Sequence, residues 1–185
     1  MTRPKSRMKQ KNKKVRQNIP TPESLPFRVS VLVFLKNTRG EYLLLKRNKA
    51  PNKNCWSPVG GKLHTHEGES PFECAVREVW EEANLTITNE DLHLFAMISE
   101  KGYEGSGHWL LFLFDCHKTL NALPPEISEG RFAFYSREAI EALALPDTDR
   151  QALWAIYDKH RQGFVALKAD CFPHKKLEII LEESH

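Results

Sequence analysis

The stretch GKLHTHEGESPFECAVREVWEEANL, which runs from Gly61 to Leu85, carries the local signals that decide the fold. Ser70, Pro71 and Glu73 predict that a helix begins here. Ser can cap the helix end, Pro fits the first helical position, and Glu three residues after the Ser completes a capping box. Apolar residues then recur at helical spacing, so we expect one stripe to face the core. The stripe consists of Phe72, Val76, Val79 and Ala83.

Three glutamates lie away from that stripe on the same predicted helix, namely Glu78, Glu81 and Glu82. Like charges at these spacings repel one another, and the helix dipole disfavours anions near the C-terminus. One explanation is a solvated acidic face, in which Arg77 pairs with Glu81. The other is a metal site. Carboxylates, together with a backbone carbonyl from the preceding Gly60-Gly61 turn, are hard oxygen ligands that suit Mg²⁺ or Mn²⁺, and these ions also bind substrate phosphates.

His64 and His66 form a rival candidate, because H-x-H pairs occur in zinc hydrolases. Such sites need further His or Asp ligands nearby. The residues that follow here are Glu67, Gly68 and Glu69. Two loop histidines without a third imidazole are more typical of ordinary surface residues, and we interpret the pair in that way.

From Glu69 onward the segment resembles the Nudix box, whose pattern is G-x5-E-x7-R-E-U-x-E-E-x-G-U with U aliphatic. Glu69 is followed after seven residues by REVWEEANL, residues 77–85. The chain departs from the pattern in two places. Seven residues instead of five separate Gly61 from Glu69, and Asn84 stands where the family has Gly. Asn tolerates a left-handed backbone better than most residues, so we expect the helix end to form.

This resemblance to the MutT-like Nudix hydrolases implies an α/β fold, a Nudix-type α/β/α sandwich with a mixed β-sheet. It implies hydrolysis of a nucleoside diphosphate linked to another group X, with Mg²⁺ or Mn²⁺ as cofactor. Glu69 and Arg77 would hold the loop against the helix. By position in the box, the metal ligands and catalytic acids would be Glu78, Glu81 and Glu82, helped by the carbonyl of Gly61 or its neighbour.

The general base is left open by the sequence. Some family members use a glutamate of the box, and others use one from a later loop. Glu126 and Glu129, in PPEISEGRF, occupy the kind of place where the later glutamate falls, although each could be a solvated loop acid. Glu100 and Glu104 are weaker candidates. Arg47 and Lys62 could contact phosphate oxygens, with solvated cations as the alternative.

Aromatic residues could stack on a base, and we assign this role to none of them because most aromatics belong to the core. Cys74 and Trp80, on the predicted helix, are interpreted as packing residues. The available aromatics are Phe27, Trp109, Phe132, Phe134 and Trp154.

Strands and helices alternate in groups after residue 25, which predicts a mixed α/β layered domain over residues 25–185. Residues 101–107 are predicted to be a flexible loop between two strands. Helices are predicted over residues 137–143 and 147–162. The predicted strands are residues 27–36, 41–47, 55–59, 92–100, 108–117, 130–136, 164–170 and 176–183.

The first 24 residues differ from the rest in charge. They hold eight of the 27 Lys and Arg residues and one of the 24 acids, and they are poor in apolar residues. We expect a basic, disordered tail that serves as a solvated, solubilising extension, with contact to RNA or another acidic surface as the alternative. No secretory signal or membrane span is recognisable, and none of the four cysteines forms C-x-x-C, so we expect a cytoplasmic protein with reduced thiols.

Together these patterns predict hydrolysis of a nucleoside triphosphate or related nucleotide to a monophosphate. Two alternatives remain open. One is a pyrophosphohydrolase that acts on RNA 5′ ends and uses the basic tail. The other is a catalytically silent Nudix-fold regulator that binds nucleotides. The sequence assigns neither the base, nor X, nor the oligomeric state.

Overall fold

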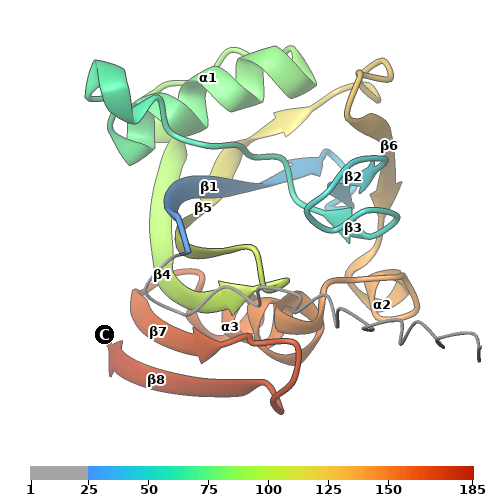
Figure 1. The fold of residues 1–185 in the computed structure, drawn as a ribbon. Coiled ribbons are helices and arrows are strands. Elements are labelled where there is room, and N and C mark those ends of the chain that lie inside the picture. Colours follow the sequence, from blue (N-terminus) through green and yellow to red (C-terminus); the bar gives the residue numbers. More distant parts are fainter. Residues whose placement is uncertain (1–24) are drawn as a thin grey trace, which may run out of the picture.

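Eight strands form the central sheet of the computed structural model, which describes residues 25–185 (Figure 1). In chain order they are β1 (Phe27–Asn37), β2 (Tyr42–Arg47), β3 (Trp56–Ser57), β4 (Leu92–Tyr103), β5 (Gly107–Leu120), β6 (Gly130–Tyr135), β7 (Val165–Asp170) and β8 (Glu178–Ser184). Their order across the sheet is β3-β2-β1-β5-β4-β7-β8, and β6 pairs with β2 outside this path. The pairs β1–β5 and β4–β7 are parallel and the others are antiparallel, so the sheet is mixed.

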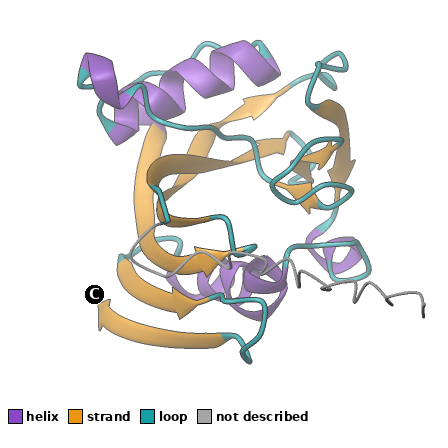
Figure 2. Cartoon of the chain, viewed as in Figure 1, coloured by secondary structure: helices purple, strands orange, loops and turns teal. Residues whose placement is uncertain are grey.

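Helices cover both faces of this sheet, as Figure 2 shows. The longest, α1 (Pro71–Ala83), packs on one face, while α2 (Arg137–Ile140) and α3 (Trp154–His160) pack on the other. Each face therefore has its own apolar core: Val79 contributes to the first, and Tyr157 to the second. The predicted α/β/α sandwich is confirmed.

The start and end of α1 follow from its own sequence. The Ser70 hydroxyl accepts a hydrogen bond from the Glu73 backbone N–H at 3.3 Å, and the Glu73 carboxylate accepts one from the Ser70 N–H at 2.8 Å. This confirms the predicted capping box. At the other end Asn84 adopts a left-handed backbone with φ of 50°. Asn thus supplies the conformation for which the family uses Gly.

Two local predictions were wrong, and a predicted helix differs in its internal geometry. Residues 101–107 form a tight hairpin rather than a flexible loop, because Tyr103 still pairs with Gly107 across β4 and β5. The second predicted C-terminal helix is divided: a π-helical turn, η4 (Asp149–Leu153), precedes α3. Trp80 is 53% exposed instead of packed, because Val79 faces the core and the next side chain on a helix points about 100° away.

The basic tail and its expected RNA contact lie in residues 1–24, outside the described part of the chain. Within residues 25–185, none of the helices has both the length and the apolar character that crossing a membrane requires.

Candidate active site

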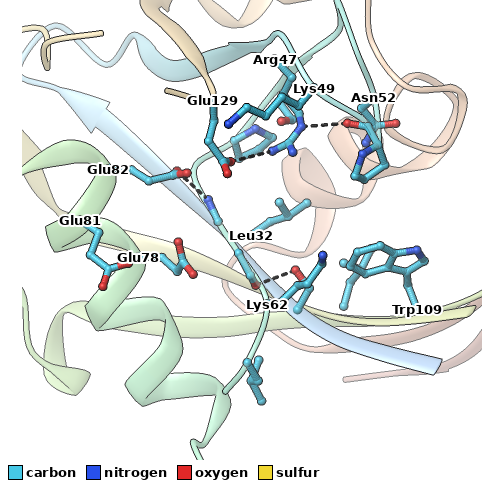
Figure 3. A pocket seen from close by; sticks show the side chains of 18 of the residues that line it. Leu32, Arg47, Lys49, Asn52, Lys62, Glu78, Glu81, Glu82, Trp109 and Glu129 are labelled. Atoms are coloured by element: carbon cyan, nitrogen blue, oxygen red, sulfur yellow. Dashed lines mark hydrogen bonds and ion pairs between the residues drawn. The ribbon is translucent and has the colours of Figure 1, made fainter. Parts of the chain in front are cut away.

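A cavity of about 790 Å³ opens between α1, the segment after β3, and the sheet. Figure 3 shows Glu78, Glu81 and Glu82 on one side of it, with Trp109 and Asn52 on the other. All three helix glutamates thus face a shared space, although they are spread over five residues of the chain. The sheet brings to this space residues that lie far from the helix in sequence.

The segment that follows β3 brings the Gly60-Gly61 turn beside β1. The Val31 N–H donates to the Gly61 carbonyl at 2.9 Å, and the Val33 N–H donates to the Val59 carbonyl at 2.7 Å. A Cβ added at Gly61 would lie 2.0 Å from the nearest carboxylate oxygen of Glu78. Glycine at this position therefore allows the carboxylate of α1 to lie directly against the turn.

Glu78 and Glu82 are buried, with exposed fractions of 9% and 8%. Burial, followed by repulsion from Glu78, raises the pKa of Glu82 to about 8, although the Gly60 N–H donates to its carboxylate at 3.2 Å. Burial also raises the pKa of Glu78, despite its contact with Arg77. Two neighbouring buried acids are costly unless positive charge compensates them. A cation bound beside these two acids would reduce that cost.

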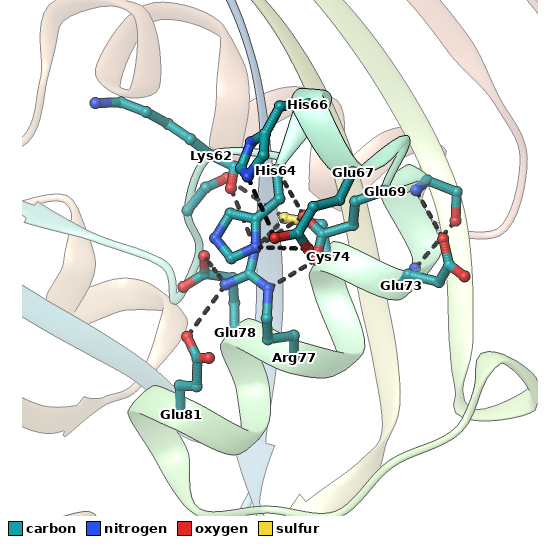
Figure 4. A network of polar contacts seen from close by, with 12 residues as sticks. Lys62, His64, His66, Glu67, Glu69, Glu73, Cys74, Arg77, Glu78 and Glu81 are labelled. Atoms are coloured by element: carbon teal, nitrogen blue, oxygen red, sulfur yellow. Dashed lines mark hydrogen bonds and ion pairs between the residues drawn. The ribbon is translucent and has the colours of Figure 1, made fainter.

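Arg77 ties the loop to the helix, as Figure 4 shows. Its guanidinium donates to both Glu69 oxygens, at 2.7 and 3.0 Å, to Glu78 at 2.7 Å, to Glu81 at 3.1 Å and to the Lys62 carbonyl at 3.1 Å. Such charged, two-point contacts with a carboxylate are strong and directional. The Arg77 hydrogen bonds lower the pKa of Glu69 to about 2. Glu69 and Arg77 therefore join the loop to the helix.

Substituting Glu69→Gln is expected to destabilise the protein by about 1–3 kcal/mol at neutral pH, because charge-assisted hydrogen bonds to Arg77 and the His64 N–H are lost or weakened. The pKa of Glu69 is lowered on folding, so its contribution is complete above its usual value of 4.5 and declines as pH falls toward 2. Urea unfolding between about pH 3 and pH 7 should show a shallower acid decline for the variant.

The exposed Glu90→Gln provides the matched control for this experiment. It should reproduce the acid decline of the parent protein. An equally steep decline for Glu69→Gln and the parent would contradict the stabilising role of the Glu69–Arg77 pair.

The carboxylate and carbonyl oxygens at this site are of the kind that a hard divalent cation prefers. In this structure, however, the carboxylates do not surround a common position. Within residues 25–185, no three His, Cys, Asp or Glu side chains form a ready-made metal cluster. Arg77 holds Glu78 and Glu81, so these side chains would have to exchange partners to bind an ion. The Gly61 carbonyl already accepts from Val31 and from the Ser30 hydroxyl, and a metal would be its third contact.

The histidine pair is placed differently from a zinc site. His64 and His66 are exposed on the loop, and both lie beside Glu67, at 3.7 and 3.2 Å. Their exposure to solvent agrees with the interpretation as surface residues. Both rings nevertheless line the outer part of the cavity.

The structure distinguishes between the two later glutamates, Glu126 and Glu129. Glu129 lines the cavity and lies 3.7 Å from Arg47, whereas Glu126 is exposed and is not part of the lining. The side chains of Arg47 and Lys62 also line the cavity. Lys49 joins them there, and the sequence analysis missed it because a lysine in a loop carries no local signal of its role.

Two further acids lie in the cavity wall. Glu100, a weak candidate from sequence, extends from β4, and Asp149 lies at the start of η4. Sequence reasoning missed Asp149. It stands in the segment DTDRQ, where an acid is typical of an exposed helix start, and only the packing of η4 against the sheet buries it.

Comparison with known proteins identifies the fold and the family. The model of the NUDIX domain matches residues 26–159. A MutT protein structure from Methanosarcina mazei Go1 is 27% identical, with a TM-score of 0.62 over 74% of this chain and 96% of that one. A mutator MutT protein from Bacillus halodurans (20% identity, TM-score 0.66, 84% and 97% covered) shares the fold. The NUDIX domain of Shewanella oneidensis NrtR, solved with ADP ribose, also shares the fold. It is 14% identical, with a TM-score of 0.59 over 74% of this chain and 88% of that one.

Proposed function

Because this chain belongs to the NUDIX domain family and is a Nudix pyrophosphohydrolase, we propose that it hydrolyses a nucleoside diphosphate linked to X, with a nucleoside triphosphate or related nucleotide as the first choice. The observation that carries this proposal is the pair of buried acids, Glu78 and Glu82, held against the Gly60-Gly61 turn at the wall of a large cavity. In the reaction, the oxygen of water bonds to one phosphorus and a P–O–P bond breaks. The products are a nucleoside monophosphate and the phosphorylated remainder, which is pyrophosphate when the substrate is a nucleoside triphosphate.

Mg²⁺ or Mn²⁺, when bound, supplies charge neutralisation of the phosphate oxygens and a lowered pKa of bound water. We assign its carboxylate ligands to Glu78, Glu81 and Glu82. Their hard oxygens suit these ions, and burial raises the pKa values of Glu78 and Glu82. Arg77 keeps the loop in place through Glu69.

Other residues that line the cavity are assigned to proton transfer and phosphate binding. Glu129 accepts the proton of the attacking water, because its carboxylate faces the same space as Glu82 and comes from outside the Arg77 network (Figure 3). Arg47, Lys49 and Lys62 line the cavity as cations, and they contact phosphate oxygens of the substrate. The Shewanella NUDIX domain, solved with ADP ribose, supports a nucleoside diphosphate derivative as a ligand for this fold.

The test is a substrate panel assayed with Mg²⁺, with Mn²⁺ and with excess chelator. It contains nucleoside triphosphates, nucleotide sugars, dinucleotide polyphosphates and capped RNA. We expect a nucleoside monophosphate among the products, formed only when a divalent ion is present. Binding of a nucleotide without any turnover would instead identify a silent regulator, and turnover of capped RNA alone would identify an RNA 5′-end enzyme.

We also propose a cytoplasmic location. Cys55, Cys74, Cys116 and Cys171 are free thiols, which is the usual state of cysteine in a reducing compartment.

A further inference from the structure

The turn that carries Glu129 is attached to the end of β2. The pairing of β2 with β6 reaches Arg47 and Gly130. Asn48 and Glu129 therefore lie opposite each other one residue beyond it. The Asn48 N–H donates to the Glu129 carbonyl at 2.9 Å, and the Asn48 side-chain amide donates to the Ser128 carbonyl at 3.2 Å. One residue thus holds two consecutive carbonyl groups of the turn.

The two ends of the same turn are held by other contacts. Ile127 and Gly130 exchange backbone hydrogen bonds at 3.0 and 3.1 Å, which closes a turn over residues 127–130. Ile127 packs against the apolar core beneath α1. A Cβ added at Gly130 would lie 2.0 Å from the Lys46 carbonyl oxygen, so this glycine lies directly against β2. Only the two middle residues of the turn depend on Asn48.

The Glu129 side chain takes its direction from this backbone. Its carboxylate lines the cavity and faces the same space as Glu82, as Figure 3 shows. Within residues 25–185 it accepts no hydrogen bond, and its one charged contact is Arg47 at 3.7 Å. A single contact at that distance does not fix a side chain that is 43% exposed. The position of the carboxylate therefore depends on how firmly the turn is held.

We propose that Asn48 is a positioning residue for the hydrolysis: its side-chain amide holds the Ser128 carbonyl and thereby keeps the Glu129 carboxylate within reach of the attacking water. The inference rests on the proposed function, which makes Glu129 the proton acceptor. Asn48 is not among the residues that line the cavity, so it acts through the turn and not on the substrate. A base must lie within hydrogen-bond distance of the proton that it accepts, and a misplacement of about 1 Å can cost about 10²-fold in rate.

A role in stability alone is the alternative. Asn48 is exposed, and one hydrogen bond at an exposed site contributes only modestly to the free energy of unfolding. Substitution should therefore leave the fold intact, and a role in stability alone predicts an unchanged kcat for the folded protein. Positioning predicts a lower kcat with an unchanged KM, because the cavity keeps its contacts with the substrate.

The experiment compares Asn48→Ala and Asn48→Asp with the parent on the preferred nucleotide in the presence of Mg²⁺. Ala removes the donor, and Asp has nearly the same shape but cannot donate to the Ser128 carbonyl when ionised. Both should lower kcat about tenfold and leave KM within about twofold of the parent. Asn48→Gln restores the amide on a longer side chain at an exposed position, so its kcat should lie within about threefold of the parent.

A double-mutant cycle tests whether Asn48 acts through Glu129. Glu129→Gln keeps the size of the side chain and removes the proton acceptor, so kcat should fall by about 10²-fold or more. Adding Asn48→Ala should lower kcat by less than about twofold further, because no base is left to be positioned. Calorimetry with an α,β-methylene analogue of the nucleotide is independent of turnover, and each variant should bind it within about threefold of the parent.

Asn121 provides the matched control. It is exposed, belongs to the segment between β5 and β6 that leads to the same turn, and makes no side-chain hydrogen bond within residues 25–185. Asn121→Ala and Asn121→Asp repeat the chemical changes without touching the turn, so kcat should be that of the parent. Thermal unfolding of each variant checks that the assays compare folded proteins.

Three results would overturn the inference. One is that Asn48→Ala and Asn48→Asp keep the kcat of the parent while Glu129→Gln loses it, which leaves the proposed function intact. Another is that the losses of Asn48→Ala and Glu129→Gln multiply in the double variant, because Asn48 then acts independently of Glu129. The third is that Glu129→Gln keeps full activity, in which case another base serves the hydrolysis and the assignment of Glu129 is wrong as well.

Discussion

Substituting Glu82→Gln is expected to lower kcat/KM for the Mg²⁺-dependent reaction by about 10²-fold or more. Glu82 combines deep burial with a cavity position beside Glu78, and an amide in its place cannot bind a divalent ion as strongly. The amide can still accept the hydrogen bond that the Gly60 N–H donates, so the local fold should persist. Steady-state kinetics on the preferred nucleotide would measure the loss.

The same variant should become more stable than the parent in the absence of divalent ions. The pKa of Glu82 is raised from 4.5 to about 8 on folding, so ionisation of this acid destabilises the fold increasingly as pH rises through that interval. Gln removes the charge and hence the penalty. Thermal unfolding in chelator at about pH 8.5 should give the higher Tm for the variant, and added Mg²⁺ should stabilise the parent more than the variant.

Glu73→Gln is the matched control on the same helix. Its side chain is exposed, and Gln also serves in a capping box, so activity should match the parent. If Glu82→Gln retained activity and the Mg²⁺ response of the parent, the assignment of the metal ligands would be wrong.

Substituting Gly60→Ala is expected to destabilise the protein by about 3 kcal/mol, which is the second large effect. A Cβ at this position would lie 2.1 Å from the Val31 carbonyl oxygen and 3.0 Å from the Leu32 Cα, which are backbone atoms of β1. Since backbone in a central strand cannot move aside alone, the turn would shift away from β1 and from Glu82. Urea unfolding gives the loss of stability, and the nucleotide assay should show reduced turnover of the folded fraction.

Gly68→Ala separates this clash from a general effect of replacing glycine. Gly68 has φ of 75° with nothing within 4 Å of an added Cβ, so only backbone strain of about 1 kcal/mol is expected. Equal losses for the two variants would show that the contact between the turn and β1 tolerates a methyl group.

Local parts of the site could be predicted from sequence because each depends on residues close together in the chain. The cap at Ser70, the left-handed end at Asn84 and the inward stripe of α1 follow from helix geometry alone. The spacing of Glu69 and Arg77 likewise falls within one loop and two helical turns. The same local reasoning failed for Trp80, because a large apolar residue predicts burial only when its direction on the helix also points inward.

Which of two similar residues belongs to the site depends on distant parts of the chain. Nothing local separates Glu126 from Glu129, yet the turn before β6 directs only the latter into the cavity. Glu100 and Asp149 are 49 residues apart, and they meet because η4 packs beside β4. No residue next to either acid in the sequence predicts that the acid is buried.

By itself, the sequence determined the family, the position of α1 and the set of acids that this helix offers. These features depend on backbone geometry and on interactions within a few residues, which the order of amino acids specifies directly. Only the tertiary structure decided which distant side chains line the same cavity, which acids are buried, and which cations face them. Burial and charge proximity depend on packing between segments far apart in the chain, and no local pattern encodes the distance between them.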